Sequence, residues 1–393
     1  MKTSILICFV FLFLQNTLLA QCDPVSGQDL IGRPCGGTLQ TAVPFLRITP
    51  DARSGAMGDV GIALSPDANA MHFNASKLAM AEEKFGVSFN YTPWLHNLGV
   101  SDIYLAYLSS YLKFGKNRNK AIGLSVRYFS LGEITWTNYN GTPLGTGHPR
   151  EFEIAGSYSQ KLNQYLSLGI TAKFINSNLA SGQSPGSGTS TIHDGRAGAV
   201  DISITYKKPI KFKNNEGDFT FGAAISNIGN KINYFQSSDF LPTNLGIGTA
   251  LNLPFDKNNR IVFALDFNKY LVPTPQPLTT DPTQSWRTTS PIAGIFKSFY
   301  DAPGGFSEEV QDISISSGVE YWFKNTVALR GGYFYEDKTK GGRQYLTTGA
   351  GVKLKSFGFN LSYLIPTSSQ RGPLDNTIRF SLSYLLPFKL IDG

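Results

Sequence analysis

The last strand-length segment of the chain alternates strictly between apolar and polar residues. Over residues 377–388, one face of an extended chain carries Ile378, Phe380, Leu382, Tyr384, Leu386 and Phe388. The opposite face carries Thr377, Arg379, Ser381 and Ser383. Alternation with an aromatic-rich apolar face recurs back to about Lys84. This pattern is typical of a closed β-barrel with lipid outside and water inside.

The N-terminus carries an export signal. Lys2 precedes an apolar run over residues 5–14, and Ala20 offers a cleavage site before Gln21, so residues 1–20 are predicted to be a signal peptide. No later stretch supplies the roughly 20 uninterrupted apolar residues that a transmembrane helix needs. A soluble β-sandwich would also alternate, but export combined with 40 Gly, 18 Tyr and 28 Phe in 393 residues favours an outer-membrane barrel.

Fourteen strands of barrel length are predicted between residues 84 and 388. They cover residues 84–92, 100–113, 120–135, 150–161, 165–179, 197–208, 218–227, 243–253, 260–272, 312–322, 326–336, 345–354, 356–365 and 377–388. The connections after even-numbered strands are mostly short and the others are mostly longer, which places the short turns and both termini in the periplasm. The predicted fold is therefore an all-β, 14-stranded antiparallel transmembrane barrel.

The segment before the barrel has a different character. Residues 21–83 are punctuated by Gly and Pro and alternate poorly, with a helix predicted over residues 68–81. We expect this segment to be a plug or a periplasmic arm, and residues 389–393 to be a C-terminal tail. Cys22 and Cys35 are candidates for a disulfide in an oxidising periplasm, with lipidation of Cys22 or two free thiols as alternatives.

Charged residues point to several classes of function. The formal net charge is +7, but no Lys/Arg run with interleaved aromatics is present, so we expect no nucleic-acid partner. Ionisable residues predicted to face the lumen are Arg127, Glu151, Glu153, Lys173, Asp201, Asp266, Glu320, Arg330 and Arg379. They indicate either a selective polar pore or an internal network of ion pairs. Basic residues in the periplasmic turns indicate a solvated rim at the lipid headgroups, or a docking surface for an acidic partner.

The predicted outer loops are rich in aromatic residues. Trp94, Trp136, Tyr139, Tyr234, Phe235, Trp286, Phe296, Phe299 and Tyr300 lie among Gly and Pro. Exposed aromatic residues favour protein recognition, although some of these are candidates for the outer aromatic girdle. The four histidines are scattered and no nucleophile motif stands out, so we expect no enzyme site, metal or cofactor.

Residues 48–74, ITPDARSGAMGDVGIALSPDANAMHFN, closely resemble the start of the PorV (LptO) family of the type IX secretion system. The resemblance implies a FadL-type barrel of fourteen strands with an N-terminal plug. Asn74 is followed here by Ala75-Ser76, where relatives usually have Pro-Ala. Plug residues singled out by this block are Asp51, Arg53, Gly55, Gly58, Asp59, Gly61 and Asn74. The glycines would allow close packing in a narrow lumen, and Asp51, Arg53 and Asp59 would pair with lumen charges.

The resemblance also implies a non-enzymatic role in secretion. Proteins of this family associate with an SprA/Sov-type translocon barrel, receive cargo by its C-terminal signal domain and deliver it to a surface attachment complex. Outer-membrane lipid and LPS would surround the barrel. Candidate cargo contacts are Trp94, Trp136, Tyr139, Tyr234, Phe235 and Trp286. The alternatives are a FadL-like channel for hydrophobic small molecules and an enzyme that modifies lipid A.

Overall fold

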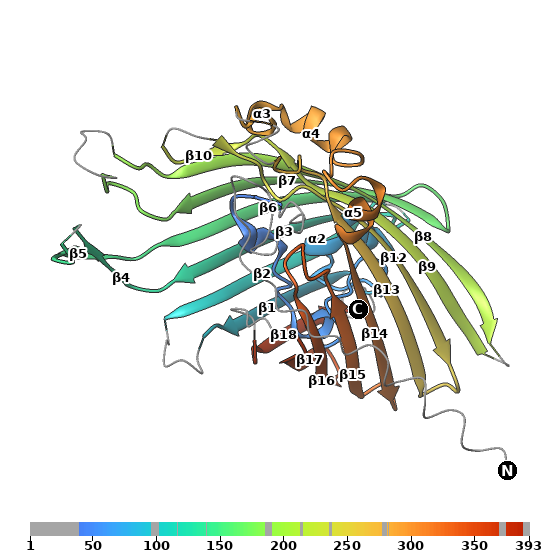
Figure 1. Cartoon of the computed structure of the whole chain (residues 1–393). Coiled ribbons are helices and arrows are strands. Elements are labelled where there is room, and N and C mark those ends of the chain that lie inside the picture. The colour runs from blue at the N-terminus through green and yellow to red at the C-terminus, as the bar shows by residue number, and fades with distance from the viewer. Residues whose placement is uncertain are drawn as a thin grey trace, which may run out of the picture.

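The computed structural model describes residues 39–95, 102–115, 117–138, 140–184, 191–212, 215–235, 238–276, 281, 283–368 and 375–387. Fourteen antiparallel strands close a barrel (Figure 1), in the order β1-β18-β17-β16-β15-β14-β13-β12-β9-β8-β7-β6-β3-β2. Their bounds are β1 Phe85–Pro93, β2 Ile103–Phe114, β3 Lys120–Leu131, β6 Arg150–Lys161, β7 Leu166–Asn178, β8 Gly195–Phe212, β9 Asn215–Gly229, β12 Asn244–Pro254, β13 Arg260–Tyr270, β14 Ile313–Phe323, β15 Val327–Tyr335, β16 Gln344–Leu354, β17 Phe357–Pro366 and β18 Ile378–Leu386.

The apolar face of each strand points outward. On β18, Phe380 and Leu382 are 38% and 53% exposed, whereas Arg379 and Ser381 between them are 1% and 2% exposed. The side-chain period of two therefore divides lipid-facing from lumen-facing residues, as the alternation predicts. All fourteen predicted strands are present, and the predicted fold class is confirmed.

One predicted strand ends early. The strand predicted over residues 120–135 stops at Leu131, because Gly132 adopts a φ of 80° and Asp102 Oδ2 accepts a hydrogen bond of 2.6 Å from the backbone of Glu133. The chain beyond forms a separate hairpin, β4 (Ile134–Thr137) and β5 (Pro143–Gly147), which projects past the barrel in Figure 1.

The outer connections hold additional elements. A short hairpin lies between β9 and β12. Its strands, β10 (Ile232–Asn233) and β11 (Ser238–Asp239), contain two residues each. The connection from β13 to β14 contains α3 (Ser285–Thr288), α4 (Pro291–Lys297) and α5 (Phe306–Gln311). No helix in the described part of the chain is long and apolar enough to span a membrane.

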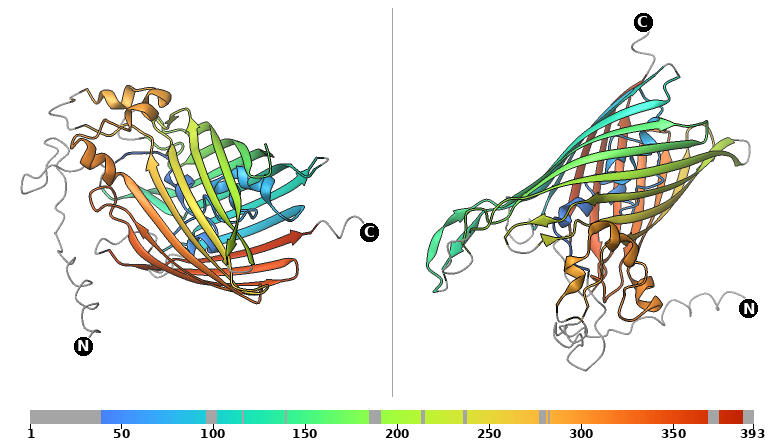
Figure 2. Two further views of the ribbon diagram at one scale, coloured as in Figure 1. Left: turned by 90° about the vertical axis from the view of Figure 1, so that its right-hand side faces the viewer. Right: turned by 90° about the horizontal axis from the view of Figure 1, so that it is seen from above.

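Residues 39–84, here called the plug, lie inside the barrel (Figure 2) and contain only short helical turns. These are η1 (Pro44–Arg47), α1 (Ala52–Gly55), α2 (Ala70–Phe73) and η2 (Ala75–Met80). Helix α1 packs against β16, β17 and β18, and η2 packs against β6 and β7. The single helix predicted over residues 68–81 is wrong, because Asn74 is extended, with φ −162° and ψ 95°, and caps η2.

The plug runs from the outer mouth to the periplasmic end. At its start, the backbone N–H of Ala42 donates to the carbonyl of Phe240 in an outer connection, at 2.9 Å. At its end, the N–H of Lys84 donates to Leu386 of β18, at 3.0 Å. The first described residue therefore lies at the outer mouth, so residues 39–84 correspond to the plug rather than to the periplasmic arm. The signal peptide, Cys22, Cys35 and the tail lie outside the described residues.

A lysine on the lipid face should destabilise the barrel according to its depth. We expect Leu382→Lys, at the middle of β18, to lower the free energy of unfolding by roughly 2–4 kcal/mol, because the ammonium would enter the bilayer midplane. Leu354→Lys, at the periplasmic end of β16 and 63% exposed, should cost about 0–1 kcal/mol. Urea unfolding in lipid vesicles measures both. Equal costs at the two depths would contradict the assigned bilayer position.

The course of the plug can be tested by labelling in intact cells. In a background with Cys22 and Cys35 changed to Ser, a membrane-impermeant maleimide should label Gln40→Cys, because Gln40 is exposed at the outer mouth. Ser65→Cys, exposed toward the periplasmic end, should react only after the outer membrane is permeabilised. Labelling of Ser65→Cys but not Gln40→Cys in intact cells would reverse the direction of the plug.

Candidate functional site

A buried ion-pair cluster joins the plug to β14 and β15. The Arg53 guanidinium of the plug donates to both carboxylate oxygens of Glu320, at 2.9 and 3.0 Å. Arg330 on β15 donates to the same carboxylate at 2.7 Å, and Glu320 has no exposed surface. Two cations on one buried carboxylate offset the cost of removing all three from water. The predicted pairing of Arg53 with a lumen charge is confirmed.

A second contact fixes the middle of the plug. Asp266 on β13 accepts hydrogen bonds from the backbone N–H groups of Gly61 and Ile62, at 2.7 and 2.9 Å. A side chain at Gly61 would collide with the ring of Phe73, since an added Cβ would lie 2.3 Å from it. Asn74 donates to Ile62 O at 3.0 Å and to wall residue Thr205 at 2.9 Å. Gly61 and Asn74 therefore act in packing and plug attachment.

A third contact lies at the β3 side. Arg127 donates to the carbonyls of Phe45 and Leu46 at 3.0 and 2.9 Å, and its second terminal nitrogen lies 2.6 Å from Nδ1 of His72. Burial, together with the charge of Arg127, lowers the pKa of His72 well below its ordinary value. Because a guanidinium group can only donate, Nδ1 of His72 accepts this hydrogen bond.

The remaining plug predictions have mixed outcomes. Asp59 lies 3.6 Å from Arg379 and accepts a 2.5 Å hydrogen bond from Tyr345. Gly55 lies against Arg379, and Gly58 has a φ of 69° with backbone close to Tyr333. The predicted pairing of Asp51 with a lumen charge is wrong. Its carboxylate instead accepts a hydrogen bond from the N–H of Ser54, at 2.8 Å, and caps α1.

All nine ionisable residues predicted to face the lumen are buried there. On the far side from Glu320, Lys173 pairs with Asp201 at 2.7 Å and also donates to Asn227 at 2.9 Å. Glu151 accepts a 2.6 Å hydrogen bond from Ser177. Side chains of both charges bind one another and the plug. This arrangement matches the predicted internal network of ion pairs, rather than a pore lined by unpaired charges.

Two cavities flank the plug and share no lining residue. The outer one, of about 90 Å³, is lined by ionisable side chains that include Arg47, Asp59, His72, Asp266, Asp312, Glu336, Lys340 and Arg343. The periplasmic one, of about 260 Å³, is lined by Arg53, Asp67, Glu82, Lys207 and Arg330 among others. Neither is the apolar passage that a hydrophobic channel requires.

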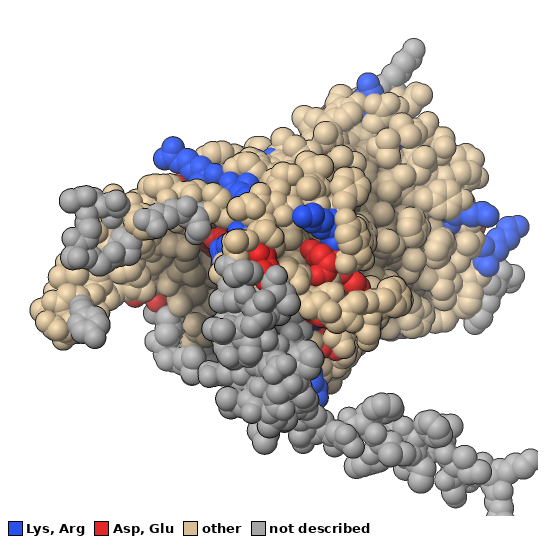
Figure 3. Space-filling view, turned by 45° about the horizontal axis from the view of Figure 1, so that its top comes forward, with Lys and Arg blue, Asp and Glu red and all other residues tan. Residues whose placement is uncertain are grey.

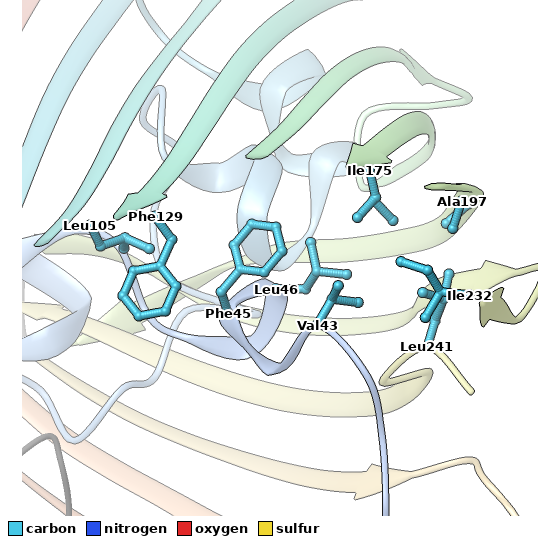
Figure 4. Close-up of a cluster of buried hydrophobic side chains, with 10 residues drawn as sticks. Val43, Phe45, Leu46, Leu105, Phe129, Ile175, Ala197, Ile232 and Leu241 are labelled. Atoms are coloured by element: carbon cyan, nitrogen blue, oxygen red, sulfur yellow. The ribbon is translucent and has the colours of Figure 1, made fainter. Parts of the chain in front are cut away.

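An apolar cluster closes the outer end of the plug (Figure 4). Val43, Phe45 and Leu46 of the plug pack against Leu105, Phe129, Ile175, Ala197, Ala199, Ile232 and Leu241 of the wall and outer connections. The rings of Phe45 and Phe129 stack at 6.4 Å. This cluster holds the start of the plug against β2, β3, β7 and β8.

The candidate cargo aromatics do not form one surface. Trp94 packs edge-on against Phe129 at 5.0 Å, and the Tyr234 hydroxyl donates to Ser177 at 2.8 Å, so both support the apolar cluster. Trp286 is 8% exposed and packs with Phe240 and Val272. Its interior position argues against direct contact with a partner.

The other aromatic candidates lie elsewhere. Trp136 lies on the projecting β4–β5 hairpin, against Gly147. Phe235 is partly exposed next to β10, and Tyr139 lies outside the described residues. The described histidines do not converge either: His148 lies 3.8 Å from Glu133 on the hairpin, and His72 is inside the plug. Within the described residues no group of three or more His, Cys, Asp or Glu side chains could hold a metal ion.

An exposed apolar patch on the β13–β14 connection is the clearest feature that the candidate list omitted. Its members are Ile292, Phe296, Phe299, Tyr300, Phe306 and Val310, which are 57%, 65%, 49%, 72%, 83% and 50% exposed. The sequence indicated Phe296, Phe299 and Tyr300 as outer-loop aromatics. It gave no sign of which aromatics in this connection would turn inward, as Trp286 does.

A closed barrel with an apolar outer wall, a filled lumen and structured outer connections defines an outer-membrane β-barrel of a Gram-negative bacterium. The family model described as "Type IX secretion system protein PorV" matches residues 36–277. The chain therefore belongs to the PorV family and is an outer-membrane component of type IX secretion. Family and fold together point to a non-enzymatic protein.

The chain is similar to solved structures of transporters and channels, of which the first below supports the fold. The Ralstonia pickettii toluene transporter TbuX is 12% identical, with a TM-score of 0.50, and the match covers 86% of this chain and 98% of the transporter. The CymD monoaromatic hydrocarbon channel is 14% identical, with a TM-score of 0.49 and coverage of 86% and 97%. A Pseudomonas aeruginosa FadL homologue is 11% identical, with a TM-score of 0.43 and coverage of 89% and 99%. The comparison with curated proteins found no match.

Breaking the Arg53–Glu320–Arg330 cluster should loosen the plug. We expect Glu320→Gln to lower the free energy of unfolding by roughly 3–5 kcal/mol, since two buried cations lose their counter-charge. Asp239→Asn breaks the pair with Arg287 in the outer connections, where both side chains are 33% exposed, and should cost about 0–1 kcal/mol. Denaturant unfolding measures the loss of stability in both variants. The coupling energy between Arg53 and Glu320 is measured by comparing Arg53→Met combined with Glu320→Gln with the two single variants. Independent effects in that double variant would argue against the ion pair.

Proposed function

We propose that this protein binds the C-terminal signal domains of secreted cargo at an SprA/Sov-type translocon barrel and carries them to a surface attachment complex, without catalysing a reaction. Membership of the PorV family supports the link to secretion. The exposed apolar patch on the β13–β14 connection is the observation that supports recognition of a protein at the outer mouth. Large apolar side chains exposed together on one connection, away from the lipid-facing strands, are typical of interaction sites.

The patch is held in place by buried ion pairs. Lys269 on β13 pairs with Glu309 of α5 at 2.8 Å and with Asp312 at 2.9 Å. Lys340, in the β15–β16 connection, pairs with Glu308 at 2.6 Å and also with Asp312 at 2.9 Å. These contacts attach α5 to two neighbouring parts of the barrel. A surface that is ordered before binding loses less conformational entropy when a partner docks.

The aromatic residues of neighbouring connections extend this surface in our proposal. Trp136 on the projecting hairpin and the partly exposed Phe235 are the members of the sequence-based set that remain accessible. Trp94, Tyr234 and Trp286 contribute by supporting the outer mouth from inside, through the contacts described above.

The alternative is a channel for hydrophobic small molecules, which the likeness in fold to the toluene transporter TbuX suggests. A channel of that kind needs an apolar pocket that continues through the barrel. The outer cavity measures only about 90 Å³ and is lined mainly by polar and charged side chains. The polar lining and the plug beside it therefore favour the secretion role over the channel.

Removing the patch should weaken cargo recognition. We expect Phe296→Ser combined with Tyr300→Ser and Phe306→Ser to weaken binding of a purified cargo signal domain at least about 30-fold, since the loss of even one aromatic anchor costs about 2 kcal/mol or more. Surface plasmon resonance on the detergent-solubilised protein gives the affinities. Phe255→Ser, 41% exposed at the periplasmic end, is the matched control and should bind as the unmodified protein does.

The outcomes separate the patch from the function. If the triple variant binds as the unmodified protein does and Trp136→Ala fails to bind, the site moves to the β4–β5 hairpin and the function stands. Affinity purification in mild detergent tests the function itself. Recovery of a very large barrel or of cargo with a shared C-terminal domain is expected, whereas a hydrophobic small molecule with neither protein would favour the channel.

A further inference from the structure

The two ends of the barrel carry opposite charge. The six periplasmic connections, residues 115–120, 161–165, 207–218, 254–260, 323–327 and 353–357, contain thirteen Lys and Arg against three Asp and Glu. The outer connections, residues 94–102, 132–149, 179–194, 230–243, 271–312, 336–343 and 367–377, contain seven Lys and Arg against twelve Asp and Glu. The periplasmic rim is therefore strongly basic, while the outer mouth is mildly acidic.

Figure 3 shows part of this separation. On the face in view, Asp and Glu side chains gather near the centre beside a few Lys and Arg side chains, and further Lys and Arg side chains stand at the upper left and at the right-hand edge, where Figure 1 has the ends of β8 and β9. Among the described residues of the rim, Lys207 pairs with Asp218 and Lys353 pairs with Glu83, each at 3.5 Å. Lys208, Lys211, Lys257, Lys324 and Lys355 are exposed.

The cations are spread around the whole circumference. Every one of the six periplasmic connections carries at least one, as follows: Arg118 and Lys120, Lys161, Lys207, Lys208 and Lys211, Lys257 and Arg260, Lys324, and Lys353 and Lys355. A ring of this kind matches a plane of negative charge that surrounds the barrel. A protein that docks on one side of the barrel would contact only some of these cations.

The ring lies next to an aromatic belt. Paired rings occur at the periplasmic ends of neighbouring strands: Phe114 with Tyr158, Tyr165 with Tyr206, Phe212 with Phe255, and Phe357 with Tyr384, at 6.4, 6.2, 6.1 and 5.1 Å. Lys324 lies over the ring of Phe323, at 5.2 Å from its centroid. Aromatic belts mark the boundary between hydrocarbon and headgroups, so the cations lie at headgroup depth.

The exposed edge of β8 argues against a protein strand as the partner. Pairing of β8 with β7 ends at Tyr206, whereas pairing with β9 continues to Phe212. No described strand pairs with the far edge of residues 208–212, and this edge carries Lys208, Pro209 and Lys211. Lysine and proline at a strand edge oppose the addition of another strand.

We propose that the periplasmic rim is a binding surface for anionic phospholipid headgroups of the inner leaflet. The exposed ammonium groups attract negative headgroups, and the adjacent aromatic belt fixes their depth. The surface is independent of the outer patch and of cargo recognition. Its consequence is a shell of anionic phospholipid around the barrel at the periplasmic side only.

Lipid binding by the full-length protein tests this surface. Native mass spectrometry in mild detergent compares phosphatidylglycerol with phosphatidylcholine, and we expect a preference of about tenfold for the former. Lys208→Gln combined with Lys257→Gln and Lys355→Gln should remove most of that preference. The matched control changes three exposed outer cations, Arg150→Gln, Lys297→Gln and Lys338→Gln, and should keep it. The preference should also weaken at high salt.

Three results would overturn the proposal. The first is equal binding of the two lipids by the unmodified protein. The second is an equal loss of preference in both triple variants. The third is an unchanged lipid preference in the rim variant together with loss of a co-purified acidic periplasmic protein, which would assign the rim to a protein partner. If the rim triple variant fails to fold, each single variant should lower the preference about twofold, and no loss in any of them would count against the surface.

Discussion

The structure depends on the pairing of charge inside the barrel. Glu320 has no exposed surface, yet it carries a carboxylate in a lumen from which the plug has excluded most of the solvent. Arg330 of the neighbouring strand supplies one counter-charge, and Arg53 of the plug supplies the other. Asp266 and Arg127 bind backbone groups of the plug in the same way. The wall therefore needs the plug to satisfy its polar face.

The dependence is mutual. The helical pieces of the plug contain only four to six residues each, too few to be stable alone. Their apolar side chains are buried against the barrel, as Val43, Phe45 and Leu46 are at the outer end. The plug also contacts the outer mouth, because Leu39 packs against the cluster of Phe240, Val272 and Trp286. Lys269 of the wall anchors the β13–β14 connection, so both plug and wall contact the connection that carries the exposed patch.

The sequence predicts on which face of a strand a residue lies far better than it predicts which other residue that side chain contacts. Period-two alternation was sufficient for all fourteen strands and for the inward direction of nine ionisable residues, because a strand offers only two faces. It could not show that Arg379 meets Asp59 while Asp51 caps a helix, since those contacts depend on the path of the plug. The same limit applies in the outer connections, where Trp286 turns inward and Phe296 outward within twelve residues of each other. The sequence of this connection has no regular repeat that would distinguish the inward side chain from the outward one.

The net charge of the chain likewise does not show how its charges are distributed in space. A value of +7 combines a basic periplasmic rim with an outer mouth that is slightly acidic, and two such surfaces meet different surroundings. Under the proposed function, the barrel must move within the membrane between a translocon and an attachment complex while its outer patch stays accessible. Attraction to headgroups on the periplasmic side would resist tilting of the barrel without involving the outer mouth. Cations confined to the rim would thus leave the apolar patch free to select protein partners.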